Sequence, residues 1–122
     1  MFPLACSPRL NDLFVEHIKE YFPETKIEDA GHFTASTDMG DITHLMPSIH
    51  PFIGGVDGGL HTKDFCVTDF DAAAILPGKV FAMNIIDLLY DEAAMAKEIL
   101  EKEKPILTKE EYLAKLESYF QS

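Results

Sequence analysis

The sequence is poor in positive charge. Its 122 residues include ten Lys and Arg against 21 Asp and Glu, which gives a net charge of -11. Nucleic acids and anionic membranes attract proteins through basic patches, so this balance argues against both as partners. A hydrophobic fraction of 47% with nine Phe and four Tyr excludes a disordered chain. We therefore expect a folded protein whose partner is another protein or a small molecule.

Cysteine and long apolar runs are also scarce. Cys6 and Cys66 are the only cysteines, and without a C-x-x-C motif they indicate neither a disulfide framework nor a thiolate zinc site. We expect reduced, buried or half-buried thiols. No run reaches the eighteen apolar residues of a membrane span, and Met1 to Cys6 lacks the charge and length of a signal peptide. These absences predict a cytoplasmic protein.

The chain has no internal repeats or low-complexity segments and is about one domain long. Apolar residues recur at helical spacing after Ser7 and Pro8, which suit a helix N-terminus, and Pro23 ends that pattern. A capping box begins at Thr108. Further helices are expected over 38–45, 69–76, 79–90 and 91–103, with a break or kink between the second and third at Pro77-Gly78.

Only two strands are expected, a weak one over 26–29 and a buried one over 48–53. Residues 31–35 and 54–59 are expected to be loops. Pro51 favours an edge strand or a bulge. Two short strands do not form an independently stable sheet. The pattern predicts an α/β, helix-rich chain that either lends its strands to another polypeptide or dimerises through them.

The stretch from Ser36 to Phe65 concentrates residues that bind metals. It holds three of the five histidines, four aspartates and five of the seven glycines. Imidazoles and carboxylates among glycine turns are typical of zinc or two-metal hydrolytic sites, because such metals take N and O ligands. His44 is expected to pack on a helix, and neither His17 nor His32 has motif support.

Three motifs of this stretch resemble one family in the same order. They are Ser36-Thr37-Asp38-Met39-Gly40-Asp41, Pro47-Ser48-Ile49-His50-Pro51 and Gly59-Leu60-His61-Thr62. Together they look like the C-terminal part of the catalytic domain of zinc-dependent amidohydrolases and metallopeptidases. That family includes the aminoacylases, the carboxypeptidase-G-type enzymes and the p-aminobenzoyl-glutamate hydrolase-like proteins. The resemblance spans roughly residues 10–89.

The resemblance implies a phosphorylase/hydrolase-like zinc-peptidase catalytic domain with a two-metal site and an inserted lid domain. By motif position His61 would be the last metal ligand, and Asp38 and His50 would orient a ligand or contact substrate. The reaction would be hydrolysis of N-acyl amino acids or peptide-like amides by a metal-bound water, with a carboxylate as base. Without family support, His61 would be a loop residue and His50 a packed histidine, and either Thr37 or Asp38 would cap the helix over 38–45.

Other parts of the family pattern are missing from the sequence. There is no His-x-Asp motif, and the single Glu-Glu pair, Glu110-Glu111, lies in a predicted terminal helix. Residues 1–122 are therefore expected to be one partial domain, without an N-terminal half or lid, that is inactive alone. Its expected partners are an N-terminal half of the same enzyme and further copies of itself. A non-catalytic module that keeps the scaffold for protein association remains the alternative.

Overall fold

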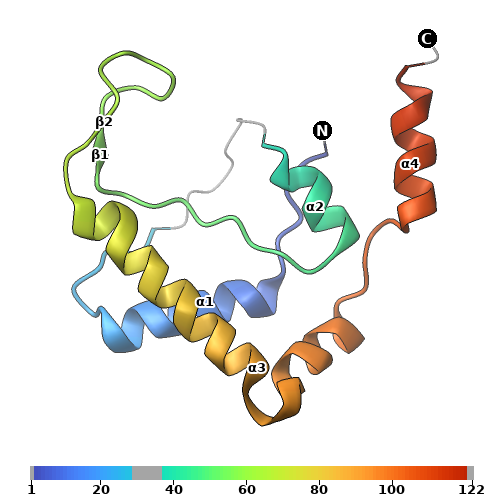
Figure 1. Ribbon diagram of the computed structural model, residues 1–122, viewed down its shortest axis with the longest axis horizontal. Helices are drawn as coiled ribbons and strands as arrows, with labels where there is room; N and C mark the ends of the chain where they lie inside the picture. Colours follow the sequence, from blue (N-terminus) through green and yellow to red (C-terminus); the bar gives the residue numbers. More distant parts are fainter. Residues whose placement is uncertain (1, 29–36, 121–122) are drawn as a thin grey trace.

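The computed structural model describes residues 2–28 and 37–120. In chain order these residues form α1 (Pro8–Tyr21), α2 (Met39–Leu45), β1 (Val56–Asp57), β2 (Cys66–Val67), the π-helical turn η1 (Asp71–Ile75), α3 (Leu76–Lys102) and α4 (Lys109–Ser118). α1 crosses beneath the first half of α3, and a long connection leads from α2 to the strands (Figure 1). The protein is helix-rich with an incomplete sheet, as the sequence predicts.

α1 begins and ends where its sequence predicts. The Ser7 side-chain oxygen accepts a hydrogen bond from the Leu10 N–H at 3.1 Å, and Pro8 occupies the first turn. Pro8 fits there because its missing N–H would have no partner inside the helix. At the other end the Phe22 N–H donates to the Ile18 carbonyl at 2.8 Å, and Pro23 follows directly.

The core lies where α1 meets α3. Phe14, Ile18 and Val80 form a buried cluster, and the Phe14 and Phe81 rings lie 5.2 Å apart between centroids. The buried His17 lies next to this cluster on α1. Its Nδ1 lies 2.7 Å from Asn84 Oδ1 and its Nε2 lies 2.9 Å from Asp87 Oδ2. Both ring nitrogens therefore have partners on α3, as a buried polar group requires.

The strand predictions are wrong in position. Residues 48–53 run without strand structure, and so do residues 26–28, while Asp29 and the predicted loop 31–35 lie outside the described residues. A strand needs a hydrogen-bonded neighbour, and Pro51 has no N–H to offer one. β1 and β2 instead pair antiparallel, with Val56 opposite Val67 and Asp57 opposite Cys66. β1 thus lies inside the segment predicted to be a loop.

The helix does not end at Pro77 and Gly78, where the sequence predicts a break or a kink. The chain passes from the π-helical η1 directly into α3, and Pro77 is buried as the second residue of α3. A π-helical turn accommodates a missing N–H without ending the helix, since such turns occur where the regular hydrogen-bond ladder is disturbed. The expected boundary between Tyr90 and Asp91, in contrast, is present.

At that boundary the backbone reverses direction. Tyr90 has a ψ of 153°, and Asp91, Glu92 and Ala93 follow with φ values of 51°, 54° and 61°. A left-handed conformation costs a residue with a side chain about 1–2 kcal/mol. We call residues 90–93 the hinge. In Figure 1 the two helical parts of α3 meet there at a sharp angle.

We call residues 94–120 the C-terminal arm and residues 2–7 the N-terminal segment. The arm returns to α2, to the N-terminal segment and to the start of α1. The Ile106 and Leu107 N–H groups both donate to the His44 carbonyl at 3.0 Å, and Glu103 Oε1 accepts from the Arg9 N–H at 3.2 Å. Within the arm α4 has the predicted capping box, in which Thr108 and Glu111 exchange hydrogen bonds of 2.8 and 3.2 Å.

Asp41 joins the N-terminal segment to this arm and makes the contact sensitive to acid. Its carboxylate accepts from the Phe2 N–H at 2.8 Å and from the Tyr112 hydroxyl at 3.0 Å. These hydrogen bonds, the one from Phe2 first, hold the pKa of Asp41 below its ordinary value of 3.8. A lowered carboxyl pKa stabilises the folded contact above the unfolded value, and that stabilisation is lost as the pH falls through the folded value.

We therefore expect the N-terminal segment and α4 to loosen as the pH is lowered below about 3.8. Hydrogen exchange of the Phe2 amide and the Tyr112 ring resonances report this directly. Asp41→Asn should weaken the contact at neutral pH and remove its acid dependence, whereas the exposed Asp12→Asn should leave the profile unchanged. An acid profile in Asp41→Asn identical to that of the native chain would contradict the assignment.

Candidate functional site

The loop that carries His61 is the turn between β1 and β2. Gly55 and Gly58 have φ values of 84° and 86°, which favour glycine. A Cβ on Gly58 would lie 2.4 Å from the Asp64 carbonyl oxygen, and one on Gly55 would lie 2.5 Å from that of Asp69. The close approach of the backbone therefore requires glycine at both positions.

His61 stands exposed in this turn in an unusual backbone conformation. Its φ is 61°, although it is not a glycine. Beside it the Thr62 N–H and hydroxyl both donate to the Gly59 carbonyl, at 3.1 and 2.8 Å. The His61 imidazole makes no hydrogen bond or ion pair to another described residue. The turn therefore presents an exposed imidazole on a left-handed residue, a conformation found more often at functional sites than elsewhere.

Asp38 is the N-cap residue of α2, but it does not act as the predicted side-chain cap. Its carboxylate makes no capping hydrogen bond and is exposed. The Thr37 hydroxyl oxygen instead accepts from the Met39 N–H at 3.4 Å. Asp38 has helical φ and ψ values of -60° and -20°, whereas a capping residue is usually extended, which explains why its side chain does not reach the helix N–H groups.

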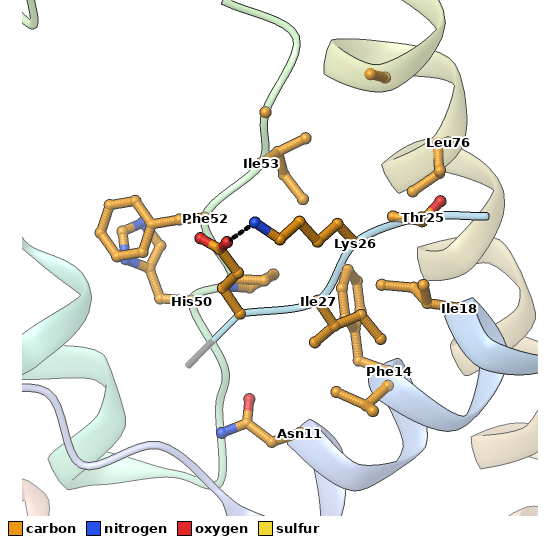
Figure 2. Close-up of a pocket in the computed structure, with 15 residues that line it drawn as sticks. Asn11, Phe14, Ile18, Thr25, Lys26, Ile27, His50, Phe52, Ile53 and Leu76 are labelled. Carbon is orange, nitrogen blue, oxygen red and sulfur yellow. Dashed lines mark ion pairs between the residues drawn. The ribbon is translucent and has the colours of Figure 1, made fainter. Parts of the chain in front are cut away.

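His50 lies on the wall of a cavity of about 570 Å³ between α1, residues 25–28, residues 50–54 and the start of α3. In Figure 2 His50 and Phe52 lie on one side of this space, and Phe14, Ile18 and Leu76 lie on the other. An ion pair joins Lys26 and Glu28 beside it. The volume and apolar wall suit a small ligand with an apolar body.

The His50 ring is held by packing rather than by hydrogen bonds. Its centroid lies 5.3 Å from that of Phe52 in an edge-on arrangement. Its Nδ1 is buried and has no hydrogen-bond partner among the described residues. A buried polar nitrogen of this kind loses the hydration it had in water, so a donor or acceptor brought by a ligand would be stabilised there.

The three predicted site residues do not meet. Asp38 is the N-cap residue of α2 and His61 lies between β1 and β2, and α2 is well separated from these strands in Figure 1. Among residues 2–28 and 37–120 no group of three His, Cys, Asp or Glu side chains could hold a metal ion. A catalytic zinc takes three protein ligands and a water. A zinc site that includes His61 would therefore need ligands from outside the described residues.

The remaining described histidines have structural roles. His44 is buried in α2, where its Nδ1 lies 2.8 Å from the Gly40 carbonyl oxygen and its ring stacks on Phe2 at 4.8 Å, which confirms the expected packing. The bridge from His17 to α3 was not predicted. The position of His17 in the sequence could have indicated it, because His17 follows Leu13 by four residues and so lies on the buried face of α1.

The two cysteines differ in exposure, and one helical segment is long and apolar. Cys6 is half-buried as expected, but Cys66 is exposed in β2, because a two-stranded ribbon has no layer to cover it. The segment Asp71–Lys102, which the hinge divides into two helical parts, is long and apolar enough to cross a membrane by length and composition alone. It includes Lys79 and Asp87.

Comparisons with known proteins find no relative of this chain. No protein-family model, no curated protein and no solved structure matches the chain.

Proposed function

We propose that this chain is the C-terminal part of the catalytic domain of a metal-dependent amidohydrolase that cleaves N-acyl amino acids or peptide-like amides. In this proposal His61 is a ligand of a zinc site whose other ligands and general base come from residues outside the chain. Asp38 and His50 contact a ligand or substrate in the completed site, and the isolated chain is inactive.

The backbone conformation and the exposure of His61 support the proposal. A histidine held at a φ of 61° is conformationally costly, and its imidazole has no hydrogen-bond or ion-pair partner among the described residues to offset that cost. The same residue is the ligand position in the family motif. A preformed, exposed imidazole is suited to a metal that other residues also bind, because little ordering entropy is lost on binding.

The alternative, a non-catalytic association module, is favoured by a different observation. Among residues 2–28 and 37–120 five hydrophobic side chains are buried, whereas many large ones are exposed, including Phe70, Leu89 and Phe120 at 66%, 64% and 81%. Large exposed apolar patches mark interaction surfaces. Both functions require a partner, but only the amidohydrolase requires His61.

Metal binding and turnover test the proposal together. We expect the purified chain to contain less than one equivalent of zinc by elemental analysis and to show no hydrolysis of N-acyl amino acids, since a single imidazole holds zinc weakly. Addition of a polypeptide bearing His-x-Asp, a bridging Asp and Glu-Glu should restore both. His61→Ala should abolish the restored activity and leave the circular dichroism spectrum unchanged.

The matched control is Lys63→Ala, which alters an exposed residue of the same turn. It should leave the restored activity within about twofold, as expected for a surface change away from the reacting groups. Tightly bound zinc near one equivalent in the chain alone would contradict the need for outside ligands. Restored activity that survives His61→Ala would instead favour the association module.

A further inference from the structure

We propose that the hinge opens in solution and that two copies of this chain exchange their C-terminal arms, forming a domain-swapped dimer. In the dimer α3 of each copy runs straight through residues 90–93, and each arm occupies the docking site on the other copy. The inference concerns assembly and is independent of the proposed enzymatic function.

The hinge conformation is opposed by its own sequence. Asp91, Glu92 and Ala93 are all left-handed, and no glycine is present to relieve the backbone. The hinge and its flanks read Leu-Leu-Tyr-Asp-Glu-Ala-Ala-Met-Ala-Lys-Glu, which is rich in good helix formers. A straight helix through the hinge would remove the left-handed residues and add regular backbone hydrogen bonds. Strained connections of this kind favour domain swapping.

The arm has contacts that a second copy reproduces. Its docking rests on the His44 carbonyl, which accepts from Ile106 and Leu107, and on Asp41, which accepts from Tyr112. The Lys115 ammonium also lies 4.7 Å from the centre of the Phe2 ring. Every partner of the arm named here lies in the N-terminal segment or in α2. The arm of a second copy therefore finds the same site with the same geometry.

Straightening also creates a surface for the second copy. In a continuous helix Ile85, Leu89, Ala93, Ala96 and Leu100 fall at spacings of three or four residues and form one apolar stripe. In the bent chain the hinge divides this stripe, and Ile85, Leu89 and Leu100 are 56%, 64% and 58% exposed. Two straight helices that pack along it cover surface that a monomer leaves in water.

One unfavourable contact arises on straightening. Asp87 and Asp91 become neighbours one helical turn apart, and like charges at this spacing repel. This repulsion is smaller than the cost of three left-handed residues in each chain. A bilayer is a poorer partner for the straightened helix, because Lys79, Asp87 and the acidic hinge lie along its length.

Sedimentation velocity of the full chain between 1 and 100 μM tests the exchange, and we expect a dimer. Glu92→Gly, which makes the bent hinge less costly and the straight helix less stable, should shift the equilibrium toward monomer by about 30-fold or more, since both hinges of a dimer are affected. Asp91→Ala should shift it toward dimer, because Asp tolerates the left-handed region better than Ala. Glu101→Gly, in the regular part of α3, should not shift it.

Exchange is distinguished from side-by-side association by isotope-filtered NMR of a mixture of labelled and unlabelled chains. The Phe2 and Tyr112 rings lie 6.2 Å apart within the docking site. In a swapped dimer their contact appears between a labelled and an unlabelled chain. A monomer at 100 μM, a dimer in which this contact is only intramolecular, or a helix that partitions into neutral lipid vesicles would each overturn the proposal. If Glu92→Gly does not fold, Ala93→Gly makes the same test.

Discussion

Phe14→Ala should destabilise this protein by about 3–5 kcal/mol, the usual cost of removing a buried aromatic ring from a core. Phe14 is 5% exposed and forms a small core cluster with Ile18 and Val80 in the described part of the chain. Phe14 also lines the cavity of about 570 Å³, so one side of its ring already faces open space. Few neighbouring side chains are therefore available to fill the space that the ring would leave. A loss of this size is comparable to the whole stability of many domains.

Urea denaturation followed by circular dichroism at 222 nm measures this effect. We expect the cooperative transition of the native chain to disappear or to move to a far lower urea concentration. Phe120→Ala is the matched control, because it deletes the same ring where it is 81% exposed. Its expected change is within about 0.5 kcal/mol. Equal midpoints for the two variants would mean that α1 and α3 do not form the core.

Gly40→Ala should release the N-terminal segment from α2. A Cβ at Gly40 would lie 1.8 Å from the Phe2 carbonyl oxygen, a distance that no side chain tolerates. Alanine normally stabilises a helix by about 1 kcal/mol relative to glycine. Here overpacking outweighs that gain, and we expect a net loss of about 1–3 kcal/mol. The Ala5 amide, which donates to the Thr43 hydroxyl oxygen at 3.1 Å, should lose its hydrogen-exchange protection.

Gly78→Ala provides a control with the opposite sign. Gly78 also lies in a helix, but a Cβ there would meet nothing within 4 Å. We expect this variant to gain about 0.4–1 kcal/mol, because alanine restricts the unfolded chain without a clash in the folded one. Stabilisation by both substitutions would show that Phe2 does not pack over α2.

Local signals in the sequence placed the helix ends well. Ser7 with Pro8 started α1, and Thr108 with Glu111 started α4, because a cap involves only residues within one turn of each other. The strand over 48–53 failed for the converse reason. Strand formation depends on a neighbour elsewhere in the chain, and short-range pattern carries no information about whether that neighbour is present.

By itself the sequence determined the helix-rich character, the helix starts, the glycine turn around His61 and the motif resemblance, since each depends on residue type and spacing. Only the tertiary structure decided that Asp38, His50 and His61 lie apart and that His17 bridges α1 to α3. It also showed that Asp91 to Ala93 reverse the course of α3. These features depend on contacts between distant segments, and a one-dimensional pattern records which residues can make a contact but not which of them meet.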